Sequence, residues 1–206
     1  MTETLDMQRG LLLNLSPGRR TYWMAQAVAI LSLVVLVSAV PFAKVQLAQL
    51  PSFVPIYESA LILNDLITAA LLFGQFAITR SRAMLALASG YLFTAATAVG
   101  HLLSFPGLFA SGGLLGAGPQ STAWIYMFWH TGFPLFVIAY AVLKSREERE
   151  PGRFPVHTLT RQTALATVAA VLGASIACVL LATVGDHLLP TIMAANRYTR
   201  TMGIVA

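Results

Sequence analysis

The sequence predicts an all-α integral membrane protein that is a bundle of five transmembrane helices. Of its residues 57% are hydrophobic and only 10% are charged, and the mean hydropathy is +0.72, which is far above the values typical of soluble domains. The hydrophobic residues form five runs, each long enough to cross a hydrocarbon core of about 30 Å. None alternates polar and apolar residues as the strands of a membrane barrel do, so we expect helices.

The chain divides into a polar arm, 1–21, and a membrane domain, 22–206. The first apolar run has a core of about 20 residues, which is longer than the 7–15 of a signal peptide, so we expect an uncleaved helix. The charged stretch Lys144–Glu150 extends the fourth helix as a solvated end before Pro151 stops it. The predicted helices cover about 22–42, 56–78, 83–105, 122–143 and 162–184.

The basic residues predict the orientation. Ten of the 13 lysines and arginines flank the helices on the side of the N-terminal arm, and three flank the other side. The positive-inside rule then places the N-terminus in the cytoplasm and the connections 43–55, 106–121 and 185–206 outside. Five crossings leave the C-terminus outside, and the apolar Met202–Ala206 resembles the start of a sixth helix. We therefore expect a truncated domain.

Polar side chains on two helices fall on one face each. At 100° per residue, those of the second predicted helix lie within an arc of about 120°, and those of the third within about 80°. Two such stripes predict a shared polar interior. The stripes are Glu58, Asn64, Asp65, Thr68 and Gln75, and Gly90, Thr94, Thr97, His101 and Ser104.

The fourth predicted helix carries a histidine, His130, inside an aromatic run that Pro134 interrupts. An ionisable residue in a spanning segment costs at least roughly 2–3 kcal/mol without a partner, so it indicates either a functional site or a structural polar network. Asp65 and His130 each lie about 12 Å inside the external boundary by helix rise. We expect them to face each other, or a common ligand, in the outer half of the bilayer. The ligand-binding candidates are Glu58, Asn64, Asp65, Thr97, His101, Trp129 and His130, and the hinge candidates are Gly132 and Pro134.

Four motifs in order resemble those of a known family. The runs Asn64–Ala69, Gly90–Ala95, His101–Phe109 and Trp124–Pro134 together are similar to the fourth MASE-type membrane-associated sensor domain. The resemblance covers nearly the whole chain. It implies an N-terminal input domain of a bacterial diguanylate cyclase or sensor histidine kinase, located in the inner membrane and followed by a further helix and a cytoplasmic output module.

The leading functional hypothesis is a non-enzymatic sensory input domain, which reads a small or apolar ligand or the state of the membrane and passes a helix shift to the output module. A second hypothesis is haem or metal binding by His101 and His130, and a third is a small transporter, although no inverted repeat supports it. The expected partners are lipids, the output domain and a second copy in a homodimer, with no nucleic acid. The single Cys178 excludes a disulfide framework.

Overall fold

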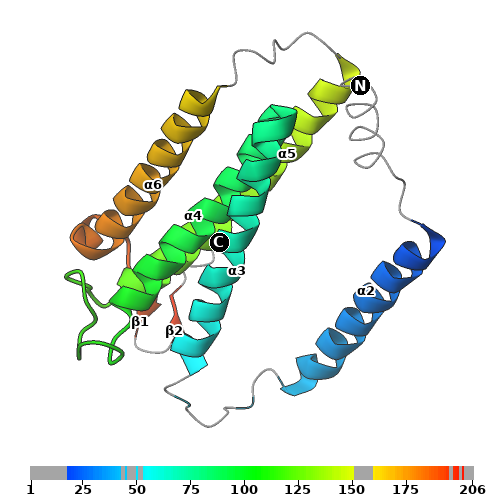
Figure 1. Ribbon diagram of the computed structural model, residues 1–206. Coiled ribbons are helices and arrows are strands. Elements are labelled where there is room, and N and C mark those ends of the chain that lie inside the picture. The colour runs from blue at the N-terminus through cyan, green and yellow to red at the C-terminus, as the bar shows by residue number, and fades with distance from the viewer. Residues whose placement is uncertain are drawn as a thin grey trace, which may run out of the picture. The chain divides into compact units, whose positions relative to one another are not determined.

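The computed structural model describes residues 18–42, 45, 50, 53–150, 160–194, 197–199 and 201. Five helices in this part of the chain are long and apolar enough to cross a membrane, which confirms the predicted class. The chain divides into two units, Met1–Gln49 and Leu50–Ala206, which we describe separately. The helices are α2 (Arg19–Ala39), α3 (Phe53–Thr79), α4 (Arg82–Ser104), α5 (Ser121–Arg149) and α6 (Arg161–Thr183), shown in Figure 1.

The first unit contains α2, which continues into the short 3-10 helix η1 (Val40–Phe42). None of the residues of α2 is buried within its own unit. Apart from Gln26, Ser32 and Ser38, its side chains after the first turn are apolar, as expected of a helix surrounded by lipid or by other membrane helices. Tyr22 and Trp23 form an edge-to-face pair with ring centroids 6.2 Å apart, at the end where aromatic residues anchor a helix to the membrane interface.

In the second unit, α4 is the central helix and packs against α3, α5 and α6. Its buried face is built mainly from Ala, Gly, Ser and Thr, the residues that let membrane helices approach closely. A Cβ on Gly90 would lie 2.8 Å from the Cβ of Phe136 on α5, and a Cβ on Gly100 would collide with the side chain of Val179 on α6. These two glycines therefore set how closely α5 and α6 lie against α4.

Four small residues of α6 have nearly the small-xxx-small spacing of closely packed membrane helices, but they do not form the contacts of α6 with α4. Val171, Ser175 and Val179 are buried, whereas the small residues Ala166, Ala170, Gly173 and Ala177 are exposed.

One end of the second unit is closed by the segment that follows α6. This segment continues through the 3-10 helix η3 (Asp186–Leu188) into a hairpin of β1 (Met193–Ala194) and β2 (Arg197–Tyr198), in which Met193 pairs with Tyr198. Gln120 holds it, because its Oε1 accepts from the amides of Ile192 (3.0 Å) and Met193 (2.9 Å), while its Nε2 donates to the Met193 carbonyl (2.7 Å). This hairpin was not predicted. The proposed start of a sixth helix, at Met202–Ala206, lies outside the described residues.

The buried core of this end links α5, α6 and the same segment. Trp124 donates from Nε1 to the carbonyl of Pro190 at 3.1 Å, and it packs in one hydrophobic cluster with Val179, Ala182 and the fully buried Ile192. The segment after α6 thus covers this end of the bundle, which we call the capped end.

At the opposite end, α5 continues past the spanning segment to Arg149, as predicted from the charged stretch Lys144–Glu150, and reaches the start of α4. Glu147 accepts from the Ser81 hydroxyl (2.7 Å) and from the backbone amides of Arg82 (2.7 Å) and Ala83 (3.3 Å). These amides belong to the first turn of α4 and have no acceptor within the helix. The prediction of a merely solvated helix end is therefore wrong for Glu147, which caps a neighbouring helix.

Candidate functional site

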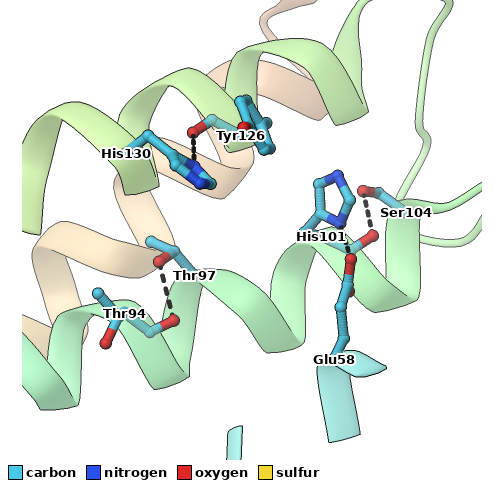
Figure 2. A network of polar contacts seen from close by, with 7 residues as sticks. All are labelled: Glu58, Thr94, Thr97, His101, Ser104, Tyr126 and His130. Atoms are coloured by element: carbon cyan, nitrogen blue, oxygen red, sulfur yellow. Dashed lines mark hydrogen bonds and ion pairs between the residues drawn. The ribbon is translucent and has the colours of Figure 1, made fainter. Parts of the chain in front are cut away.

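The central contact of the candidate site joins Glu58 on α3 to His101 on α4. The His101 Nδ1 lies 2.7 Å from the Glu58 Oε1, and both residues are buried. Glu58 follows the first residue of α3 by five positions and His101 precedes the last residue of α4 by three, so both lie near the capped end of the bundle. Two of the seven predicted ligand-binding candidates are thereby brought together (Figure 2).

The second carboxylate oxygen of Glu58 has an unusual environment. Glu58 is only 4% exposed, and its Oε2 is buried with no hydrogen-bond partner. A buried polar atom left unpaired costs about 1–3 kcal/mol, and more if it is charged. Buried polar groups in native proteins are nearly always satisfied, so such an atom calls for an explanation, for example a proton or a polar group that binds there.

Asp65 lies deeper in the bundle and makes a separate contact between the same two helices. Its Oδ2 accepts from the Thr94 hydroxyl at 2.7 Å, and the same hydroxyl also lies 2.8 Å from the carbonyl of Tyr91. Asp65 is 9% exposed and Thr94 is 3% exposed. Two polar side-chain contacts, Glu58–His101 and Asp65–Thr94, therefore connect the polar stripes that the sequence predicts on α3 and α4.

His130 does not take the predicted position. Its side chain is exposed on the surface of the second unit, and its Nδ1 donates to the carbonyl of Tyr126 on the same helix at 2.9 Å. The Tyr126 ring stacks on the imidazole with centroids 3.7 Å apart. The expected direct pairing of Asp65 with His130 is thus absent from the structure. Figure 2 shows His130 turned to its own helix and His101 turned to Glu58.

The two histidines are nevertheless connected through an aromatic residue. The buried Trp129 ring lies 6.4 Å from the His101 ring and 4.6 Å from the His130 ring, centroid to centroid. The ring of Phe105, directly after the end of α4, lies 5.8 Å from the His101 ring, centroid to centroid. A movement of the His101 ring would therefore act on α5 through the packing of Trp129, although no hydrogen bond joins the two histidines.

The remaining predicted residues have local roles. The Thr97 hydroxyl is fully buried and bonds to the carbonyls of Phe93 (2.7 Å) and Thr94 (3.1 Å) in its own helix. Asn64 is exposed, and its carbonyl accepts from Thr68 at 2.8 Å. Neither side chain joins the contacts between α3 and α4.

The predicted hinge is part of an unbroken helix. Pro134 lies inside α5, which continues from Ser121 to Arg149 without ending at this proline. A Cβ on Gly132 would collide with the Phe93 ring on α4. Gly132 is therefore a site of close packing, and bending at this position stays a prediction.

Comparison with known families now identifies the chain. A family model described as MASE4, a membrane-associated sensor, integral membrane domain, matches residues 48–203. The chain belongs to this family. The MASE4 match begins close to the boundary between the two structural units, and it includes α3 to α6 and the hairpin. No curated protein and no solved structure matches the chain.

The MASE4 chain is thus a membrane-associated sensor domain with several spanning helices, in agreement with the resemblance seen in the sequence. The stripe pattern found Glu58 and His101 but did not single out their pairing. Glu147 was missed, although an acidic residue at the end of one helix and a Ser at the start of its antiparallel neighbour are a recognisable capping combination.

Proposed function

We propose that the Glu58–His101 pair is the place where this membrane sensory input domain reads its stimulus. The observation that carries the proposal is the buried, unpaired Oε2 of Glu58 beside an imidazole. An ionisable pair is an expensive way to hold membrane helices together, because interhelical hydrogen bonds contribute only about 0.6–2 kcal/mol. Its presence is better explained by a group that binds or transfers a proton there.

The two ends of α4 suggest how the reading is transmitted. At one end α4 contacts the stimulus site, and at the other its first turn is held by Glu147 of α5. A small ligand or a proton that changes the Glu58–His101 distance would shift α4 against α3, and the rigid contact with α5 would carry this shift to the opposite side of the membrane. Such a domain alternates between two helix arrangements whose populations the stimulus changes. The receiver would be a cytoplasmic output module, in the bacterial inner membrane protein of which the domain is part.

A fusion of the chain, through one added membrane-spanning helix that returns to the cytoplasm, to a diguanylate cyclase catalytic domain would test this proposal. Output would be measured in membrane vesicles during a step in external pH and during addition of benzyl alcohol, which fluidises the bilayer. Glu58→Gln and His101→Gln should each change basal output and abolish the response to at least one of the two stimuli. The matched control is Glu148→Gln, an exposed carboxylate near the far end of α5.

Two outcomes would contradict the proposal. One is a wild-type response in both site variants at equal expression. The other is a loss of response in Glu148→Gln as large as that in the site variants, which would show that removal of any carboxylate disturbs the fusion.

A second candidate function, haem or metal binding, is supported by the hydrogen bonds of the two histidines. In both His101 and His130 the Nδ1 is committed to an acceptor, and the Nε2 has no hydrogen bond among the described residues. This arrangement is typical of histidines that bind a metal through Nε2. The described residues contain no group of three or more His, Cys, Asp or Glu side chains that could hold a metal ion, so this candidate rests on His101 and His130 alone. A Soret band in the purified protein that is lost in His101→Ala would support it, and a flat spectrum after haem addition would exclude it.

A further inference from the structure

A second candidate site lies on a different side of α4 and was not predicted from the sequence. It is a cavity of about 240 Å³ between α4 and α6, within the membrane-spanning part of the chain. The floor is formed by Gly100, Ser175 and Val179, which are all buried. The rim is formed by side chains that are partly exposed toward the surroundings of the bundle, namely Val99, Leu172, Ile176 and Leu180.

The cavity is separate from the polar site. Its α4 residues, such as Ala96 and Gly100, and the polar stripe with Thr97 and His101 are centred about 120° apart around the helix. The Glu58–His101 pair therefore does not contribute to the cavity, and an occupant of the cavity would act on α6 first.

The chemistry of the lining selects an apolar occupant. Among the described residues that line the cavity, Ser175 is the only one with a polar side chain, and its hydroxyl already donates to the carbonyl of Val171 at 3.0 Å. No polar side-chain group is therefore left to orient a polar ligand. The volume is also below the roughly 300–1,000 Å³ of a site for a compact small molecule, which favours a segment of a linear chain.

The mouth of the cavity nearest the capped end is shaped by a strained residue. Leu115 lies in the Gly-rich loop, residues 105–120 between α4 and α5. It contributes to the lining, and its φ of 64° is in the left-handed region that non-glycine residues rarely adopt. That conformation costs roughly 1–2 kcal/mol, and such strain concentrates at ligand-binding and switch positions. It holds the Leu115 side chain over the gap between α4 and α6.

We propose that this cavity binds one acyl chain of a membrane phospholipid. The helices that form it span the bilayer, its rim opens beside apolar side chains, and hydrocarbon chains are the most abundant apolar molecules around such helices. The lipid headgroup would lie near the loop between α4 and α5, of which Leu115 lines the cavity. Chain length and unsaturation would then change how α6 packs on α4. This inference is independent of the proposed role of Glu58 and His101.

Fluorescence quenching can test the proposal, because Trp124 packs against Val179, the residue that also forms the cavity floor. The full chain, with Trp23→Phe and Trp129→Phe to leave one tryptophan, would be reconstituted in vesicles of phosphatidylcholine brominated on one acyl chain. Quenching is the loss of Trp124 fluorescence in these vesicles relative to vesicles of unbrominated phosphatidylcholine. Ala96→Phe fills the cavity from α4, and Ala70→Phe places the same ring on an exposed position of α3 as a control.

The proposal expects strong quenching of Trp124 in the parent and in Ala70→Phe, and at least a twofold weaker effect in Ala96→Phe. Equal quenching in all three would overturn it, because contact with bulk lipid would explain the signal. Quenching by added brominated fatty acid in unbrominated vesicles, with none from brominated phospholipid, would overturn the choice of phospholipid. If Ala96→Phe does not fold, Leu172→Phe serves as a second cavity-filling variant with the same expected result.

Discussion

The Nδ1 of His101 on α4 lies 2.7 Å from the Oε1 of Glu58 on α3, and the Oε2 of the same carboxylate is buried without a hydrogen-bond partner. Removal of one member of a buried ionisable pair is more damaging than removal of both, because the survivor loses its compensation. Penalties of about 3–5 kcal/mol are typical for such single removals in water-soluble proteins, whereas polar contacts in membranes average about 0.6 kcal/mol.

We expect His101→Ala to destabilise the second unit by about 1–3 kcal/mol, between these two limits. The double variant Glu58→Gln/His101→Ala should recover part of that loss, since a neutral amide is cheaper to bury than a carboxylate. Unfolding in mixed detergent micelles would give the free energies of unfolding of the parent, of Glu58→Gln, of His101→Ala and of the double variant. Additive effects of the two substitutions would contradict an energetically coupled pair.

The contact of Asp65 with Thr94 leads to a second prediction. Thr94→Val keeps the shape of the side chain but removes the hydroxyl that donates to the Asp65 Oδ2. It should lower the free energy of unfolding by about 1–2 kcal/mol. Thr94→Ser keeps the donor and is the matched control, with an expected loss below about 1 kcal/mol. Equal effects of Val and Ser would show that the methyl group, and not the hydrogen bond, matters at this position.

The sequence predicted the contacts between α3 and α4 better than those of α5, and periodicity explains the difference. On α3 and α4 the polar residues occupy narrow stripes, so the helical period alone assigns Glu58, Asp65, Thr94 and His101 to facing sides. The aromatic run around His130 is apolar on nearly all faces, so helical periodicity does not indicate which face turns toward α4. Helix rise gave the depth of His130, but its rotation about the axis was left undetermined, and the predicted pairing with Asp65 failed for that reason.

Glu147 and Gln120 illustrate a second limit of the sequence. Their partners are 64–66 and 72–73 positions away along the chain, so each contact depends on how far one helix slides against another. Neither local propensity nor hydropathy contains that information. The lengths of the spanning helices, by contrast, follow from the thickness of the bilayer, and their bounds, with the extension of α5 through the charged stretch, were predicted to within a few residues.

The Glu147 cap provides a third prediction with an adjacent control. Glu147→Ala removes the acceptor for the Ser81 hydroxyl and for two amides of the first turn of α4, and loss of a helix cap typically costs about 1 kcal/mol. Glu148→Ala removes only an exposed ion pair with Lys144 at 3.2 Å, worth about 0.3–0.5 kcal/mol. Hydrogen exchange at the amides of Arg82 and Ala83 should accelerate several-fold in the first variant only. Unchanged exchange in Glu147→Ala would rule out the cap.

The fourth prediction concerns the cap at the other end of the bundle. Gln120→Ala removes three hydrogen bonds to Ile192 and Met193, which should release the segment after α6 without unfolding the helices. We expect faster hydrogen exchange at these two amides and new proteolytic cleavage near residues 190–194. Gln75→Ala, at an exposed position of α3, should show neither effect. Protection equal to the parent in Gln120→Ala would mean that packing of Ile192 alone holds the segment.

The orientation in the membrane is the last prediction, and it rests on the distribution of charge. Ten of the 13 basic residues flank the side that contains the N-terminal arm and Lys144–Glu150, and the positive-inside rule places this side in the cytoplasm. Cysteines introduced at Ser111, in the Gly-rich loop, and at Ser145, near the end of α5, can be labelled in intact cells with Cys178 replaced by Ala. Ser111 is exposed in the structure and Ser145 is half-buried, so accessibility in detergent must first be shown for both. The prediction is that a membrane-impermeant thiol reagent modifies Ser111→Cys in intact cells and modifies Ser145→Cys only after permeabilisation. The reverse pattern would show that the domain has the opposite orientation, with the Glu58–His101 pair on the cytoplasmic side and the Glu147 cap outside.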